Sequence, residues 1–178
     1  MNRALDFAST VRHDGHGGLA DDLATPAGLA EWAGLDAASE ELWQEVVALR
    51  WAVRSLFARA AAAGERMDTP HLVPPDEALR LVNGAAARVP RVARLEWDGQ
   101  PRVRYVDSAT PGERLLADLA TAVIEFLASE ERAALRACPA PRCIRYFVKA
   151  HPQQQWCKPS CGNRARVSRH YRKRERER

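Results

Sequence analysis

The chain lacks any apolar run that approaches the ~20 residues needed to cross a bilayer. Residues 1–18 also lack the continuous apolar stretch of a secretory signal, and they carry two aspartates and two histidines instead. Together these absences predict a soluble, cytoplasmic protein without a membrane partner. With 46% apolar and 28% charged residues, the composition is not that of a disordered protein, so we expect one or two folded domains.

Cysteine is absent from residues 1–137, and acidic residues are scarce after them. Residues 1–137 carry 15 Lys and Arg against 21 Asp and Glu, a net charge of −6. Residues 138–178 carry 12 against 2, a net charge of +10. A basic segment behind an acidic one is typical of a protein with a polyanion partner, although a solvated basic tail has the same composition. Charge therefore indicates nucleic-acid contact only for the C-terminal segment.

Apolar periodicity in the first segment indicates helices. Apolar residues recur at steps of three and four over about residues 39–62 and 111–127. Shorter helices are predicted after Thr25 and after Pro74. The period changes to two within residues 91–107, around an Asp-Gly pair, which predicts a β-hairpin. The expected fold class is mainly α with a small β-hairpin (α+β).

No nucleophile–base pair, phosphate-binding loop or metal-ligand spacing is evident in residues 1–137, so we do not expect an enzyme. His13, Asp14, His16, Asp21 and Asp22 lie close together, but their Gly-rich segment has no ligand spacing. We interpret these five side chains as solvated.

Four cysteines follow the spacing C-x4-C-x13-C-x3-C, and two close pairs separated by a spacer are typical of a metal site. Four thiolates suit one structural zinc ion, because zinc prefers closed tetrahedral sulfur coordination. Disulfides, an iron–sulfur site and unrelated thiols are the alternatives, but no oxidising compartment is indicated and neither pair has C-x-x-C spacing. The predicted zinc ligands are Cys138, Cys143, Cys157 and Cys161.

The residues between and after the cysteines predict a treble-clef-like zinc finger. The alternation of Ile144, Tyr146 and Val148 indicates a strand, and we expect Trp156 on the returning strand. A final helix should begin around the second cysteine pair. Val167 and Tyr171 are four residues apart and are expected to pack on the finger's own aromatic residues.

The final helix is crowded with basic residues, and the metal would fix its N-terminus. Phosphate contact is the commoner role for an arginine, whereas Arg166 and Arg169 are our candidates for reading bases, because they lie nearest the anchored end. The predicted nucleic-acid-binding residues are Arg164, Arg166, Arg169, Arg172 and Lys173.

Three segments, "CPAPRC", "RYFVKAHPQQQWC" and "CGNRARVSRHYRKR", resemble the CGNR zinc finger at the C-terminus of bacterial ABATE-domain proteins. "ALDFASTV" and "LATPAGLAEWAGL" are similar to the start of the ABATE domain. The family is described as stress-induced transcription regulators. The resemblance implies zinc at the four cysteines and DNA binding by the finger.

We therefore expect a helical ABATE-like domain at residues 1–137, for sensing or dimerisation, and a CGNR-type zinc finger at residues 138–178. The predicted function is a zinc-dependent transcription regulator whose basic helix contacts duplex DNA. The expected partners are duplex DNA, a second copy in a homodimer, and a small-molecule effector. The alternatives are an RNA-binding or ribosome-associated zinc module and a protein-interaction scaffold.

Overall fold

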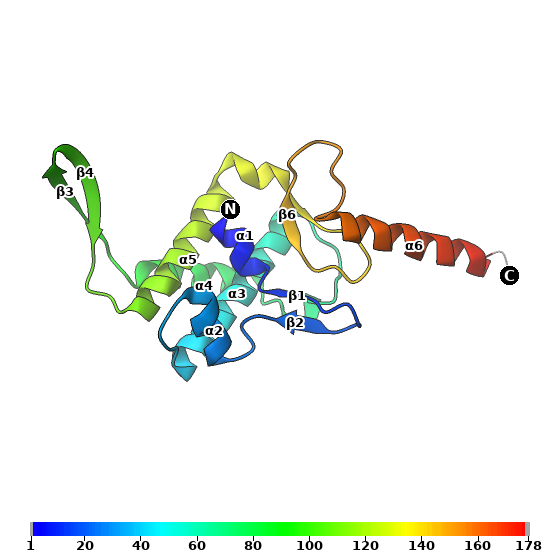
Figure 1. The fold of residues 1–178 in the computed structure, drawn as a ribbon, viewed down its shortest axis with the longest axis horizontal. Helices are drawn as coiled ribbons and strands as arrows, with labels where there is room; N and C mark the ends of the chain where they lie inside the picture. The colour runs from blue at the N-terminus through cyan, green and yellow to red at the C-terminus, as the bar shows by residue number, and fades with distance from the viewer. Residues whose placement is uncertain (1, 177–178) are drawn as a thin grey trace.

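The structure is a computed structural model that describes residues 2–176, without the side chains of Lys173 and Arg176. Helices build the centre of the molecule, a β-hairpin projects from one end, and the last helix projects from the other (Figure 1). The helices of the body are α1 (Arg3–Ala8), α2 (Pro26–Ala33), α3 (Glu40–Ala60), α4 (Pro75–Ala87) and α5 (Pro111–Ala128), with short 3-10 helices at Thr69–His71 and Glu130–Ala134.

The helices begin where the sequence places capping residues. Thr25 and Ser39 accept hydrogen bonds from backbone N–H groups in the first turns of α2 and α3. Thr110 and Glu113 form a capping box at the start of α5. The predicted helices, their N-termini and the mainly α fold class are confirmed. None of the described helices combines the length and the apolar character needed to cross a membrane.

The core of the body is built around α3, which packs against α1, α2, α4 and α5. Fully buried residues of α3, among them Val53 and Phe57, belong to one apolar cluster with buried residues of α5 such as Leu119 and Val123. Leu135 and Tyr146, which come from the C-terminal part of the chain, belong to the same apolar cluster. The rings of Phe57 and Tyr146 meet edge to face, with centroids 5.6 Å apart. The core therefore includes residues on both sides of position 137.

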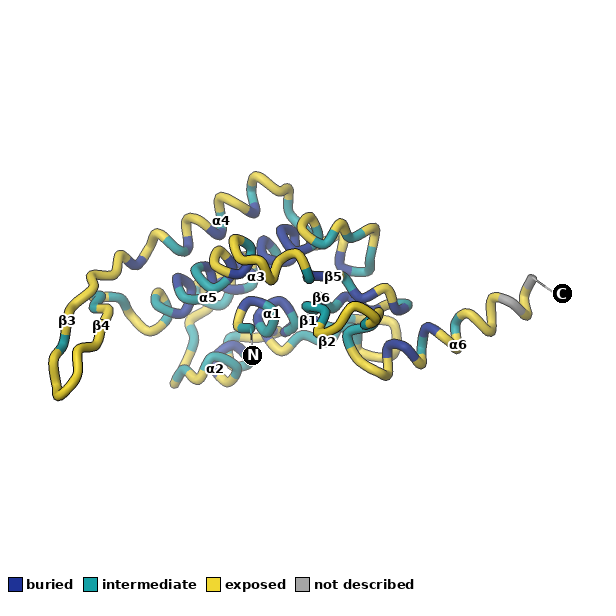
Figure 2. The backbone as a smooth tube through the Cα atoms, turned by 90° about the horizontal axis from the view of Figure 1, so that it is seen from above, coloured by how far each residue is buried: buried dark blue, intermediate teal, exposed yellow. Residues whose placement is uncertain are grey.

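The described strands form three antiparallel pairs. β1 (Val11–His13) pairs with β2 (Leu19–Asp21), and β3 (Val92–Asp98) pairs with β4 (Gln100–Val106). The second pair is the predicted hairpin, and it stands clear of the body as an exposed arm (Figures 1 and 2).

The strand pairing of the finger differs from the sequence prediction. The predicted strand is present as β6 (Tyr146–Val148), but its partner is β5 (Leu135–Ala137), which precedes the first cysteine. The prediction of a returning strand at Trp156 is therefore wrong, and residues 149–158 form turns and bends. The segment from Cys138 to Arg145 turns the chain back so that β5 and β6 can pair. Arg142 adopts a left-handed φ of 60°, and the Cys138 N–H donates to the Arg145 carbonyl oxygen.

The division of the chain into two domains at residue 137 stays a prediction.

The last helix, α6 (Pro159–Arg176), packs on the finger only through its first turns. Cys161, Gly162 and Ala165 are buried there. Val167 and Tyr171 are 54% and 62% exposed, so the prediction that they pack on the finger's aromatic residues is wrong. Both residues lie on the part of α6 that extends beyond the finger into solvent, so the finger's aromatic residues are not opposite them (Figure 2).

Candidate metal centre

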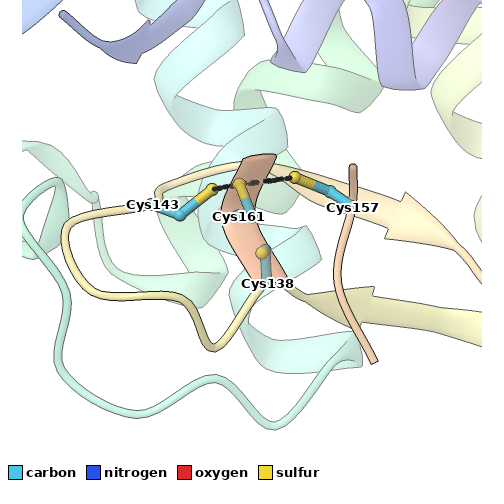
Figure 3. Close-up of side chains that lie close together, drawn as sticks. All are labelled: Cys138, Cys143, Cys157 and Cys161. Atoms are coloured by element: carbon cyan, nitrogen blue, oxygen red, sulfur yellow. Dashed lines mark hydrogen bonds between the residues drawn. The ribbon is translucent and has the colours of Figure 1, made fainter. Parts of the chain in front are cut away.

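The four cysteines come together at one point, although they lie on different segments (Figure 3). Cys138 follows β5, Cys143 precedes β6, Cys157 lies in the loop before α6, and Cys161 lies in the first turn of α6. Their Sγ atoms all lie within 4.8 Å of one another. Cys161 Sγ lies 3.5 Å from Cys157 Sγ and 3.8 Å from Cys143 Sγ, and the last two sulfurs are 3.8 Å apart.

These separations fit tetrahedral zinc. Four sulfurs at about 2.3 Å from a central ion lie about 3.8 Å from each other. All four cysteines are free thiols, which opposes the disulfide alternative. Among residues 2–176, no other group of three or more metal-ligating side chains converges. The donor set therefore matches a closed structural site, and we propose these four cysteines as the ligands.

The surroundings of the cluster favour the thiolate form at Cys143 but not at Cys157. Hydrogen bonds with the thiols of Cys138 and Cys157 hold the pKa of Cys143 well below its usual range, whereas hydrogen bonds with Cys138 and Cys143 raise the pKa of Cys157. Arg164 donates a hydrogen bond from Nη2 to Cys161 Sγ, at 3.5 Å. Its positive charge offsets the negative charge that thiolates bring. Arg164 thus lies against the cluster, whatever its role toward a nucleic acid.

Sequence reasoning missed the polar contacts that join the finger to the body. Arg54 of α3 is fully buried, and it contacts Asp68 through both Nε and Nη2. It also donates to the carbonyl oxygen of Ile144, at 2.6 Å, and to that of Ala8. Burial lowers the pKa of Arg54, and the charge of Asp68 opposes that shift. The side chain of Arg54 therefore links α3 to the end of α1 and to the residues of the finger that precede β6.

A second arginine reaches the metal-bearing turn. Arg66 donates from Nη2 to the carbonyl oxygens of Cys143 and Arg145, at 3.3 and 3.4 Å. Its guanidinium group lies over the ring of Tyr146, with the centroid 4.6 Å away. The sequence contains one signal for the buried pair of Arg54 and Asp68. Arg54 directly follows the buried Val53, so a charged residue lies within an otherwise apolar part of α3.

The prediction that the polar residues of the N-terminal hairpin are solvated holds for Asp14, His16 and Asp22, which are exposed, and is wrong for Asp21, which is partly buried. Asp21 pairs with the buried Arg50, and Asp22 pairs with Arg12. Asp14 accepts three backbone N–H groups within its own turn. Burial lowers the pKa of His13, and the charge of Arg164 in the finger adds to that shift.

Gly162, which directly follows Cys161, lies against the indole ring of Trp156. A Cβ atom at position 162 would lie 2.9 Å from Trp156 Cδ1. Trp156 packs on the cysteine cluster, so its ring cannot move without disturbing the site.

Gly162→Ala is therefore expected to lower the stability of the finger by about 1–3 kcal/mol through overpacking. The matched control is Gly84→Ala, in the interior of α4, where no atom lies within 4 Å of the new Cβ. That control should gain roughly 0.5–1 kcal/mol from helix propensity. Chemical unfolding of the two zinc-loaded variants measures the difference. Equal stabilisation by both would show that the Trp156 contact is unimportant.

The basic residues of α6 are mostly exposed. Arg166, Arg169 and Arg172 face solvent, and none of the ion pairs described for residues 2–176 includes them. Arg166 donates from Nη2 to Asn163 Oδ1, at 2.8 Å, so these two side chains of α6 contact each other. The side chain of Lys173 lies outside the described residues.

This arrangement defines a class of protein: a helical domain that carries a four-cysteine zinc finger and presents a basic helix. Residues 1–130 match the ABATE family, described as "Putative stress-induced transcription regulator". Residues 134–174 match the CGNR zinc finger. The chain belongs to the ABATE family and carries a CGNR zinc finger, whose four cysteines are positioned to bind one structural zinc ion. Comparison with curated proteins gave no match.

Proposed function

We propose that the protein is a zinc-dependent transcription regulator that binds duplex DNA through α6. The observation that carries the proposal is the placement of this helix. Its first turn contains Cys161 of the metal cluster, and its exposed arginines lie on the part that projects beyond the finger (Figure 1). The family description supports a regulatory role, with stress as the signal.

The dimensions of α6 suit a duplex. At 1.5 Å per residue, the portion from Arg166 to the end of α6 extends roughly 15 Å. The major groove of B-DNA is about 12 Å wide and admits an α-helix. Arg166 and Arg169 are three residues apart and share a face near the anchored end, so we assign them to base edges. We assign Arg164, Arg172 and Lys173 to phosphates.

In this proposal the body is the sensor, and it binds a small-molecule effector. The protein acts in the cytoplasm as a homodimer. Two features support a connection between sensor and finger. Arg54 and Arg66 of the body bind backbone carbonyls at Cys143–Arg145. In addition, a groove of about 700 Å³ lies between residues 61–67 and the turn that carries Cys138 and Cys143. A molecule bound there would contact both parts.

The expected result for DNA binding is a steep salt dependence. If α6 neutralises about five phosphates, the plot of log K against log salt has a slope on the order of −4 to −5. Fluorescence anisotropy with the zinc-loaded chain and a labelled duplex measures that slope. RNA of equal length is the comparison, and we expect it to bind more weakly, because Phe147 and Trp156 pack on the cysteine cluster and leave Tyr171 as the exposed aromatic ring that the described part of the finger offers for stacking.

Two outcomes would contradict the proposal. Tighter binding to single-stranded RNA at the same salt concentration would favour the RNA-binding or ribosome-associated alternative. Binding to neither nucleic acid would leave the basic helix to an acidic protein partner, as in the scaffold alternative.

A further inference from the structure

We propose that the β3–β4 arm is a self-association surface, and that its occupant is the same arm of a second copy of this chain. The starting point is where apolar surface remains exposed. Nine large apolar side chains are exposed among the described residues, and five of them lie on the arm. Those five are Val92, Leu95, Trp97, Val103 and Tyr105.

The strand register places apolar residues on one side of the arm. Leu95 pairs with Val103, Trp97 with Pro101, and Ala93 with Tyr105. Because alternate residues of a strand point to opposite sides, these three pairs share one side, which we call the apolar face. The other side carries Arg94, Glu96, Arg102 and Arg104, and Glu96 forms ion pairs with the last two.

This face has nothing to pack on within its own chain. Trp97 is 72% exposed, Leu95 67%, Tyr105 63% and Val103 60%, and the arm points away from the body (Figure 2). An isolated two-stranded hairpin is marginal in water, and an apolar face of this kind normally packs against another element. The alternation of apolar and polar residues in β3 and β4 thus produces an apolar face that the monomer leaves exposed.

The chemistry of the two sides selects the partner. The apolar face carries no charge, so two copies can meet on it without burying an unpaired ion. Nucleic acid fits poorly, because the arginines that would contact phosphates lie on the opposite side of the arm. The face is formed by two paired strands, and none of the pockets described for residues 2–176 is lined by it.

The exposed area is sufficient for a weak dimer. With aromatic side chains of ~150–250 Å² each, the four most exposed side chains of the face offer about 500 Å² per copy. Face-to-face packing around a two-fold axis would bury about 1,000 Å² from these side chains alone, close to the ~1,200–2,000 Å² of a specific interface. The main chain and the neighbouring residues supply the remainder.

The base of the arm is fixed to the body, which lowers the cost of association. Arg114 of α5 donates from Nη2 to Asp107 Oδ1, at 2.6 Å, and to the Ala109 carbonyl, at 2.9 Å. Arg91 pairs with Asp118 of the same helix. The hydrogen bond from Arg114 also holds the pKa of Asp107 below its usual range. An arm held in one orientation loses less freedom on binding. Since the arm and α6 lie at opposite ends of the molecule, the dimer would leave both basic helices free (Figure 1).

Sedimentation equilibrium of the full zinc-loaded chain, from 1 to 200 µM, tests the inference without reference to DNA. The wild type should move from 19.8 kDa towards twice that mass. The dissociation constant should be on the order of 10 µM, given the modest area. Trp97→Ser should raise that constant at least about 30-fold, because it removes the largest side chain of the face. Leu95→Ser with Trp97→Ser should be monomeric throughout.

The control is Arg94→Ser, which changes the opposite side of the arm next to Leu95 and should leave the constant within about threefold. Each variant should keep the zinc content and the circular dichroism spectrum of the wild type, which verifies that the body and the finger stay folded. A wild type that remains monomeric at 200 µM would overturn the inference, as would a dimer that Leu95→Ser with Trp97→Ser does not weaken. A monomeric wild type whose arm gained amide protection only on adding DNA would assign the face to nucleic acid, and would overturn it too.

Discussion

Cys161→Ser is expected to unfold the finger from residue 138 onward. Structural zinc contributes roughly 10–16 kcal/mol in small fingers, comparable to the entire ~5–15 kcal/mol stability of an ordinary domain. Cys161 Sγ lies within 3.8 Å of two other sulfurs, and its residue also begins α6, so one substitution removes both a ligand and the attachment of the helix. Elemental analysis should give one zinc per wild-type chain and none in the variant.

Hydrogen exchange locates the loss. Amides of residues 138–176 should lose protection in Cys161→Ser, whereas the buried stretches of α3 and α5 should keep theirs. His170→Ala is the matched control, because His170 is an exposed potential ligand on the same helix and lies outside the cysteine cluster. A wild type that contains no stoichiometric metal when purified without chelator would refute the zinc site.

Arg54→Met is the second substitution with a large expected effect, a loss of about 3–5 kcal/mol of stability, because it leaves the buried carboxylate of Asp68 without its hydrogen-bonded cation and with only the longer pair to Arg66, at 3.8 Å. The carbonyl oxygens of Ala8 and Ile144 also lose their donor. Arg59→Met, on the exposed side of the same helix, should change stability by less than about 0.5 kcal/mol. Urea unfolding of the zinc-loaded variants measures both.

A double substitution separates the buried charge from the carbonyl contacts. Adding Asp68→Leu to Arg54→Met should recover part of the lost stability, since it removes the buried carboxylate that has lost its hydrogen-bonded cation but does not restore the donors to the carbonyl oxygens. The body and the finger should also unfold less cooperatively in Arg54→Met, because one of the contacts that join them is lost, while those of Arg66 and Tyr146 remain. A loss below about 1 kcal/mol in Arg54→Met would show that this pair does not join the two parts.

Local signals explain what the sequence predicts correctly. The caps at Thr25, Ser39 and Thr110 act on the next turn of chain, and the cysteine spacing reflects a constraint that the metal imposes within one short segment. The convergence of the four cysteines was therefore predictable by residue, and the helices nearly so.

Features that depend on distant partners were not predictable in this way. β5 is a three-residue strand whose partner lies beyond the first cysteine pair, so its own residues carry little signal. The Arg54–Asp68 pair spans two elements, and nothing near Asp68 in the sequence marks it as buried. Val167 and Tyr171 have helical spacing, but spacing does not show whether a surface lies opposite them.

The most direct test of the account is the binding of wild type, Arg166→Ala and Arg169→Ala to a selected duplex and to a scrambled one, at one stated salt concentration. If the zinc-anchored helix reads the major groove, at least one variant should lose about 1–3 kcal/mol on the selected site and far less on the scrambled duplex. The zinc-loaded state of each protein is verified first. Equal losses on both duplexes would reduce these arginines to phosphate contacts, and unchanged binding to both would contradict the claim that α6 is the DNA-binding element.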